Sequence, residues 1–142
     1  MSLQKARTYF KSAFKSIGYT EHLDGFQDEN LGEINLNKAF HVRAVSIEGG
    51  SINQLDQRTE TNIIVSTYYK GLRTADEANQ IALKEVEKVL KQCVNITNRT
   101  SDGVLNVVFN RAEIRPIDDT NAIHCVIDYD FDVTIMIGVE ED

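Results

Sequence analysis

The sequence predicts a single-domain α+β protein in which two helices pack on one face of a four-stranded, mainly antiparallel sheet, in the order αββαββ. Two stretches carry apolar residues at helical spacing, and four others are rich in β-branched and aromatic residues. The last of these alternates strictly between apolar and polar residues. The chain of 142 residues is long enough for one hydrophobic core to stabilise it without disulfides or a structural metal.

The first helix is expected at about residues 3–17, where the apolar positions share one helical face. These positions are Leu3, Ala6, Phe10, Ala13, Phe14 and Ile17. Gly18 suits the end of this helix. Residues 19–37 are mostly polar and form a long connection for a compact domain, where about 4–6 residues is usual. This segment either hides short structure or packs as a functional segment.

Two strands are expected next, at 38–48 and 60–70, because both stretches are rich in β-branched and aromatic residues. The connection between them, GGSINQLDQRT, is too long for a tight hairpin turn and should project. A second helix then starts at Thr74, which has the capping-box spacing with Glu77. Its apolar stripe runs to about residue 93: Ala78, Ile81, Ala82, Val86, Val89, Leu90 and Cys93.

The closing strands are expected near 104–117 and 123–138. In the last strand the odd-numbered residues are apolar and predict the core face. The even-numbered face is polar and should be wet: His124, Asp128, Asp130, Asp132 and Thr134. In the preceding strand the apolar residues switch from odd to even positions, which predicts a β-bulge near 110–112. The bulge would bring Arg111 and Arg115 to the face of Asp128 and Asp130.

Composition and charge exclude several classes of protein. The net charge of −7 and a pI near 4.9 argue against direct binding of nucleic acid, because such binding needs a basic patch. No stretch approaches the ~18 apolar residues of a membrane span, and the N-terminus lacks a secretory signal. Cys93 and Cys125 lack metal-site spacing, so we expect two reduced core thiols.

No residues form a predicted active site. The three histidines are far apart and lack a metal-binding motif, so each is expected on the surface or in a hydrogen bond. No nucleophile motif is present, and Gly49-Gly50-Ser51 lacks the lysine of a phosphate loop. We therefore predict no catalytic residue, no metal ligand and no cofactor, and we expect that the chain is not an enzyme.

Three carboxylates form the most distinctive pattern, because Asp128, Asp130 and Asp132 stand on one strand face at intervals of ~6.5–7 Å. They could hold a hard cation, form a solvated face or form a deliberately acidic lining. A straight strand spreads them along a line and does not wrap an ion, so no metal is predicted. Four scattered arginines either balance nearby acids or pair across a subunit boundary: Arg43, Arg73, Arg111 and Arg115.

One motif is Asn37-Lys38-Ala39-Phe40-His41-Val42-Arg43, and a second runs from Thr61 through Val65 to Tyr69-Lys70-Gly71-Leu72-Arg73. Both resemble segments of small phage tail terminator and tail completion proteins of long-tailed bacteriophages. The resemblance ends with Val107-Val108-Phe109 and the alternating last strand, so it spans roughly 37–138. Its motifs are strand and turn signatures, and residues 19–36 match no pattern of the family.

The resemblance implies a homohexameric ring that caps the tail tube, ends its polymerisation and joins the tail to the head connector. It implies a virion protein at the head-proximal end of the tail, assembled in the host cytoplasm, with no membrane partner. The expected partners are the tail tube protein and the head-tail connector protein. DNA passes through the hole without specific binding, and the family has no catalytic residues to carry over.

Site residues are expected on two surfaces of such a ring. The hole should be lined by the three carboxylates, because a negative lining repels DNA. Contacts with a neighbouring subunit or partner are expected from Arg43, Gly49, Gly50, Asn53, Gln54, Asp56 and Arg73. Two other classes remain open: a small ferredoxin-like ligand-binding or enzymatic α+β domain, and an adaptor that binds a partner through an edge strand.

Overall fold

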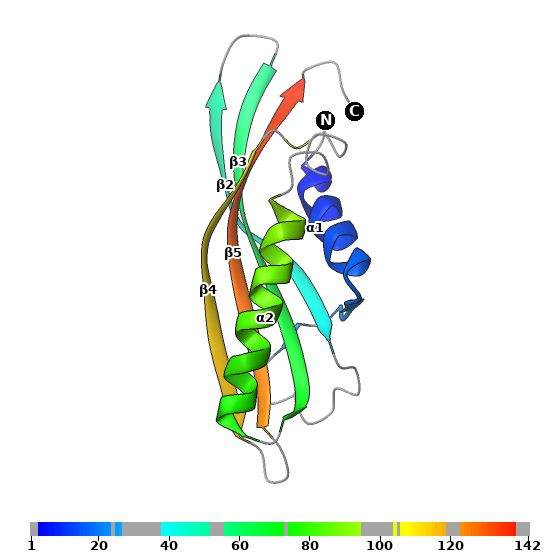
Figure 1. The fold of residues 1–142 in the computed structure, drawn as a ribbon. Coiled ribbons are helices and arrows are strands. Elements are labelled where there is room, and N and C mark those ends of the chain that lie inside the picture. The colour runs from blue at the N-terminus through cyan, green and yellow to red at the C-terminus, as the bar shows by residue number, and fades with distance from the viewer. Residues whose placement is uncertain are drawn as a thin grey trace.

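Two helices lie against the same face of a long, twisted sheet (Figure 1). The computed structural model describes residues 3–23, 25–26, 38–51, 56–72, 74–94, 104, 106–118 and 123–138. The helices are α1 (Gln4–Ser16) and α2 (Ala75–Cys93). The strands are β1 (Thr20–Glu21), β2 (Ala39–Ser51), β3 (Asp56–Leu72), β4 (Asn106–Asp118) and β5 (Ile123–Gly138). In the described part of the chain, neither helix is long and apolar enough to cross a membrane.

The predicted four-stranded, mainly antiparallel sheet in the order αββαββ is wrong. The sheet has five strands in the order β1-β2-β3-β5-β4, and it is mixed because β1 pairs in parallel with β2. The other three pairs, β2 with β3, β3 with β5 and β5 with β4, are antiparallel. The prediction missed β1 because a strand of two residues carries no periodic pattern.

The end of α1 places β1 beside β2. Gly18 adopts a left-handed φ of 96°, and its N–H bonds to the carbonyl of Lys15 at 3.2 Å. The N–H of Tyr19 reaches back to the carbonyl of Phe14 at 3.1 Å, and the two rings pack at 5.5 Å. These are the bonds and the apolar contact of a Schellman motif, which reverses the chain direction. Thr20 then donates to the carbonyl of Lys38 at 3.0 Å.

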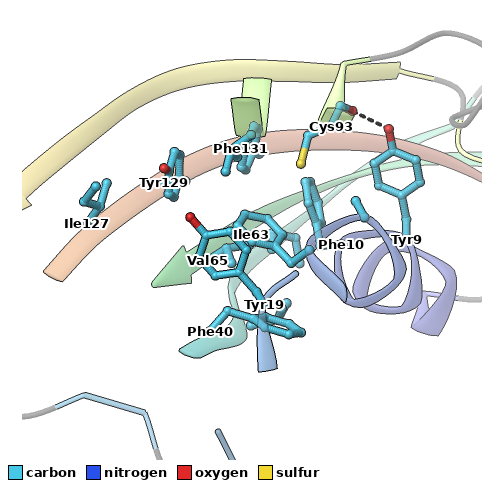
Figure 2. Close-up of a cluster of buried hydrophobic side chains, with 14 of the residues drawn as sticks. Tyr9, Phe10, Tyr19, Phe40, Ile63, Val65, Cys93, Ile127, Tyr129 and Phe131 are labelled. Carbon is cyan, nitrogen blue, oxygen red and sulfur yellow. Dashed lines mark hydrogen bonds between the residues drawn. The ribbon is translucent and has the colours of Figure 1, made fainter. Parts of the chain in front are cut away.

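The main core lies between the helices and the sheet (Figure 2). Phe10 of α1 packs on Phe131 of β5 at a ring distance of 4.8 Å, and Phe14 stacks on Phe40 of β2 at 5.5 Å. The hydroxyl of Tyr9 donates to the backbone carbonyl of Cys93, so α1 is tied to the end of α2 (Figure 2). The predicted helix cap is confirmed, because the hydroxyl of Thr74 accepts from the N–H of Glu77 at 3.1 Å.

The predicted β-bulge in β4 is confirmed. The register against β5 shifts between Phe109 and Arg111, so Arg111 lies opposite Asp130. Arg115 then reaches Asp128, with 3.2 Å between Nε and Oδ2. A second shift in register, between Ala44 and Ser46, marks β2. The paired ends of β2 and β3 extend past both helices (Figure 1). The projecting connection was predicted at 49–59, but residues 49–51 pair with residues 57–59 as part of the two strands. Residues 52–55 lie outside the described residues.

Candidate functional site

The face of the sheet opposite the helices, called here the back face, carries the predicted carboxylates. We call Asp128, Asp130 and Asp132 the acidic row. All three are half-buried, while their odd-numbered neighbours in β5 are buried in the main core. The alternation along β5 therefore places the row as the sequence predicts, on the face that the helices do not cover.

Neighbouring side chains hold each carboxylate of the acidic row in place. The Asn62 amide donates to Asp130 at 2.5 Å and to Asp132 at 3.0 Å. The Ser66 hydroxyl donates to Asp128 at 2.5 Å, and the Asn110 amide donates to Asp130 at 3.1 Å. In the described residues, only Asp128 of the row has a cationic partner, Arg115. Since amides and hydroxyls are neutral, the row is ordered but keeps most of its negative charge.

A pocket of about 330 Å³ opens on the back face beside the acidic row. It is lined by Gly25, Phe26, His41, Arg43, Ser66, Arg115 and Asp128. Arg43 and Asp128 were predicted on two different surfaces, a subunit contact and the wall of a hole. They share one pocket, because β2, β3, β5 and β4 lie side by side and their register brings these residues into adjacent rows.

One end of the back face is buried, which corrects the prediction that the polar face of the last strand is exposed to solvent along its length. Phe26 packs on a second small core formed by Ala39, Tyr68 and Val126. Its ring stacks on Tyr68 at 5.4 Å, and Tyr68 stacks on His124 at 5.7 Å. Phe26 thus lies on the back face, and Val126 and His124 at this end of β5 are buried.

The predicted subunit-contact residues that the structure describes lie at two places, Arg43 midway along β2 and the others at the paired ends of β2 and β3. Arg43 is exposed on β2, Gly49 and Gly50 lie near the far end of that strand, and Asp56 is the first residue of β3. Asn53, Gln54 and Arg73 lie outside the described residues.

Two of the histidines, His22 and His41, meet at the edge of the back face. The Nδ1 of His41 lies 3.0 Å from the carbonyl of His22, and because a carbonyl only accepts, this nitrogen carries the proton. His124 Nδ1 lies 3.0 Å from the Tyr68 hydroxyl. Within the described residues, no three His, Cys, Asp or Glu side chains are placed to hold a metal ion.

A buried polar cluster under α2 was missed by the sequence analysis. Glu85 is only 4% exposed and contacts Lys38 at 2.8 Å, Lys88 at 3.0 Å and the Tyr19 hydroxyl at 3.1 Å. The Tyr19 hydroxyl also shares a hydrogen bond with that of Tyr69. The sequence does indicate that Glu85 is buried, because it lies on the apolar stripe of the second helix, four residues from both Ile81 and Val89.

The charges of this cluster are set by burial and by the lysines. Burial opposes ionisation of Glu85, but its bonds to Lys38 and Lys88 outweigh burial and hold the pKa of the carboxyl below its usual value. Burial raises the pKa of Tyr69 to about 12 and raises the pKa of Tyr19 further. The cluster therefore holds one carboxylate and neutral tyrosines at neutral pH, which suits a structural junction between α1, α2 and the sheet.

Comparison with known proteins relates the chain to a virus-like particle through its fold. No family model and no curated protein matches the sequence. Among solved structures, a chain in "Virion of native gene transfer agent (GTA) particle" matches with a TM-score of 0.53. It is 11% identical, and the match covers 94% of this chain and 90% of that chain. This protein thus has the fold of a component of a gene transfer agent virion.

Proposed function

We propose that this chain is a structural virion protein of a phage or phage-like particle, which forms a homohexameric ring that caps the tail tube. The ring would end tube polymerisation and join the tail to the head connector. The observation that carries the proposal is the fold shared with a gene transfer agent virion chain over 94% and 90% of the two lengths. The tail terminator resemblance supports the finer role.

The sheet offers two different open edges for a ring contact. On β2, β1 covers only Ala39 and Phe40, so the strand edge from 41 to 51 is unpaired within the described chain. The other edge is β4. Because the two edges differ, a contact between them would be head-to-tail, and a closing rotation would produce a ring. Pro116 and the bulge at Asn110 limit backbone pairing along β4, so the contact would need side chains as well.

The acidic row would face the hole through which DNA passes without specific binding. Its carboxylates are held by neutral donors, so six copies would present a strong negative field to the phosphates. The proposed partners are the tail tube protein and the head-tail connector protein. The proposed location is the head-proximal end of the tail, after assembly in the host cytoplasm. This role requires neither catalysis nor a cofactor.

The mass of the purified protein in solution tests the ring. Light scattering should give six times the protomer mass of 16.0 kDa, and negative-stain images should show rings. Gold-labelled antibodies should bind at the junction of head and tail in intact particles. A monomer at every accessible concentration, or label at another position, would contradict the proposal.

A second candidate, a small ligand-binding or enzymatic domain, is favoured by the back-face pocket. Its volume of about 330 Å³ is within the range of small-molecule sites, and Arg43, Arg115 and Ser66 converge on it. Saturable binding of a small anion by a monomer, abolished by Arg43→Ala, would favour this candidate over the ring. Arg111→Ala is the matched control, because Arg111 pairs with Glu113 and is not among the residues that line the pocket.

A further inference from the structure

A second pocket, of about 210 Å³, lies between α2 and the C-terminal end of β3. Four of the eight lysines of the chain line it: Lys38, Lys70, Lys84 and Lys88. Among the described residues that line the pocket, Glu85 is the only acid, although the chain as a whole has a net charge of −7. The local charge is thus opposite in sign to that of the molecule, and the pocket attracts anions.

Glu85 pre-organises the pocket without cancelling its charge. Its two oxygens hold Lys38 and Lys88, so one carboxylate positions two ammonium groups. Lys38 adopts a left-handed backbone with φ of 57°, an unfavourable conformation for a residue with a Cβ, and its ammonium also lies 5.2 Å from the centre of the Tyr19 ring. In the described part of the chain, Lys84 has no carboxylate partner.

The remaining wall of the pocket is apolar. Tyr69, Leu72 and Ile81 complete the lining, and the stems of the lysines add further methylene groups. A compact, fully hydrated anion would gain nothing from these walls. A carboxylate on a short apolar stem would match both halves of the pocket, since the ammonium groups pair with its charge and the walls cover its stem.

We propose that this lysine pocket binds a carboxylate carried on a short apolar stem. Such a group is presented by a glutamate side chain in an acidic segment of a protein partner, and also by a free aliphatic acid. The inference uses only the chemistry of the pocket and does not depend on the tail role. It assigns a recognition function to the face of the molecule that carries α2.

Amide NMR titration of the full-length protein tests the site, with hexanoate as the probe. Hexanoate should shift the amides of residues 81–88 saturably in the millimolar range, and hexanol should not. Lys84→Met should weaken binding about fivefold, the upper end for one exposed ion pair. Lys91→Met is the matched control: Lys91 is on the same helix, pairs with Glu87 and is not among the lining residues. It should bind like the wild type, and both variants keep the partners of Glu85.

The remaining outcomes decide the source of the carboxylate or overturn the proposal. A short peptide with one glutamate between leucines that binds at least tenfold tighter than hexanoate would assign the site to a protein partner, and equal affinity would assign it to a free acid. Equal binding of hexanoate by Lys84→Met and wild type would overturn the proposal. So would tighter binding of inorganic phosphate than of hexanoate, or binding of hexanol at the same residues.

Discussion

Replacing Glu85 by alanine should lower the free energy of unfolding by about 2–3 kcal/mol. The Glu85 side chain is 6% exposed, accepts a hydrogen bond from Tyr19 and forms ion pairs with Lys38 and Lys88. Removing one partner of a fully buried ion pair costs about 3–5 kcal/mol. The cost is smaller here because Lys38 and Lys88 are 35% and 41% exposed and can turn into water, while Tyr19 keeps its bond to Tyr69.

Urea unfolding followed by circular dichroism at pH 7 measures this cost. Glu87→Ala is the matched control, because Glu87 lies on the same helix, is 70% exposed and pairs with Lys91 at 3.2 Å. It should cost no more than about 0.5 kcal/mol. Glu85→Gln keeps an acceptor for Tyr19 and should fall between the two. Equal losses for Glu85→Ala and Glu87→Ala would refute the assignment of Glu85 as a buried junction.

The pH dependence follows from the same carboxylate. Folding holds the pKa of Glu85 below its usual value of 4.5, so the folded state favours the charged form. Its contribution is therefore complete above the unfolded pKa and is lost as pH falls through the folded pKa. The stability difference between wild type and Glu85→Ala should stay constant from neutral pH to about 5 and shrink below 4.5. A difference that grows in acid would contradict the argument.

Three further predictions concern other parts of the molecule. Changing the whole acidic row to Asn should alter stability by less than about 1 kcal/mol and leave the ring intact, while DNA retention rises at low salt and fades with added salt; loss of assembly would instead make the row an interface. Gly18→Ala should cost about 1 kcal/mol in thermal unfolding, because Gly18 has a positive φ. Gly25→Ala should cost more, because Gly25 also has a positive φ and only there would the added Cβ lie 3.3 Å from the His41 ring. Thiol titration should count two reactive groups per chain in denaturant and none in the folded protein, since Cys93 and Cys125 are fully buried and burial raises the pKa of both thiols; fewer than two in denaturant would show oxidation.

The sequence by itself determined the elements whose pattern repeats along the chain. The capping box at Thr74 and the apolar stripe after it predicted α2, and the alternation along 123–138 predicted β5. Near Asn110 the apolar residues change from odd to even positions, and this change predicted the bulge and the approach of Arg115 to Asp128. The sequence predicts these features because the repeat of a helix or strand backbone sets which side chains share a face. A break in the resulting apolar pattern marks an irregularity such as a bulge.

Only the tertiary structure decided how unpatterned residues meet across the sheet. Three features depend on segments distant in sequence: the strand of two residues, the packing of Phe26 on Tyr68, and the pocket that Arg43 and Asp128 share. Glu85 shows the same limit, because its charge is tolerated in the interior only where Lys38, far away in the chain, reaches it. Local periodicity reports which face of an element is buried, whereas the partners on that face are set by strand order and register.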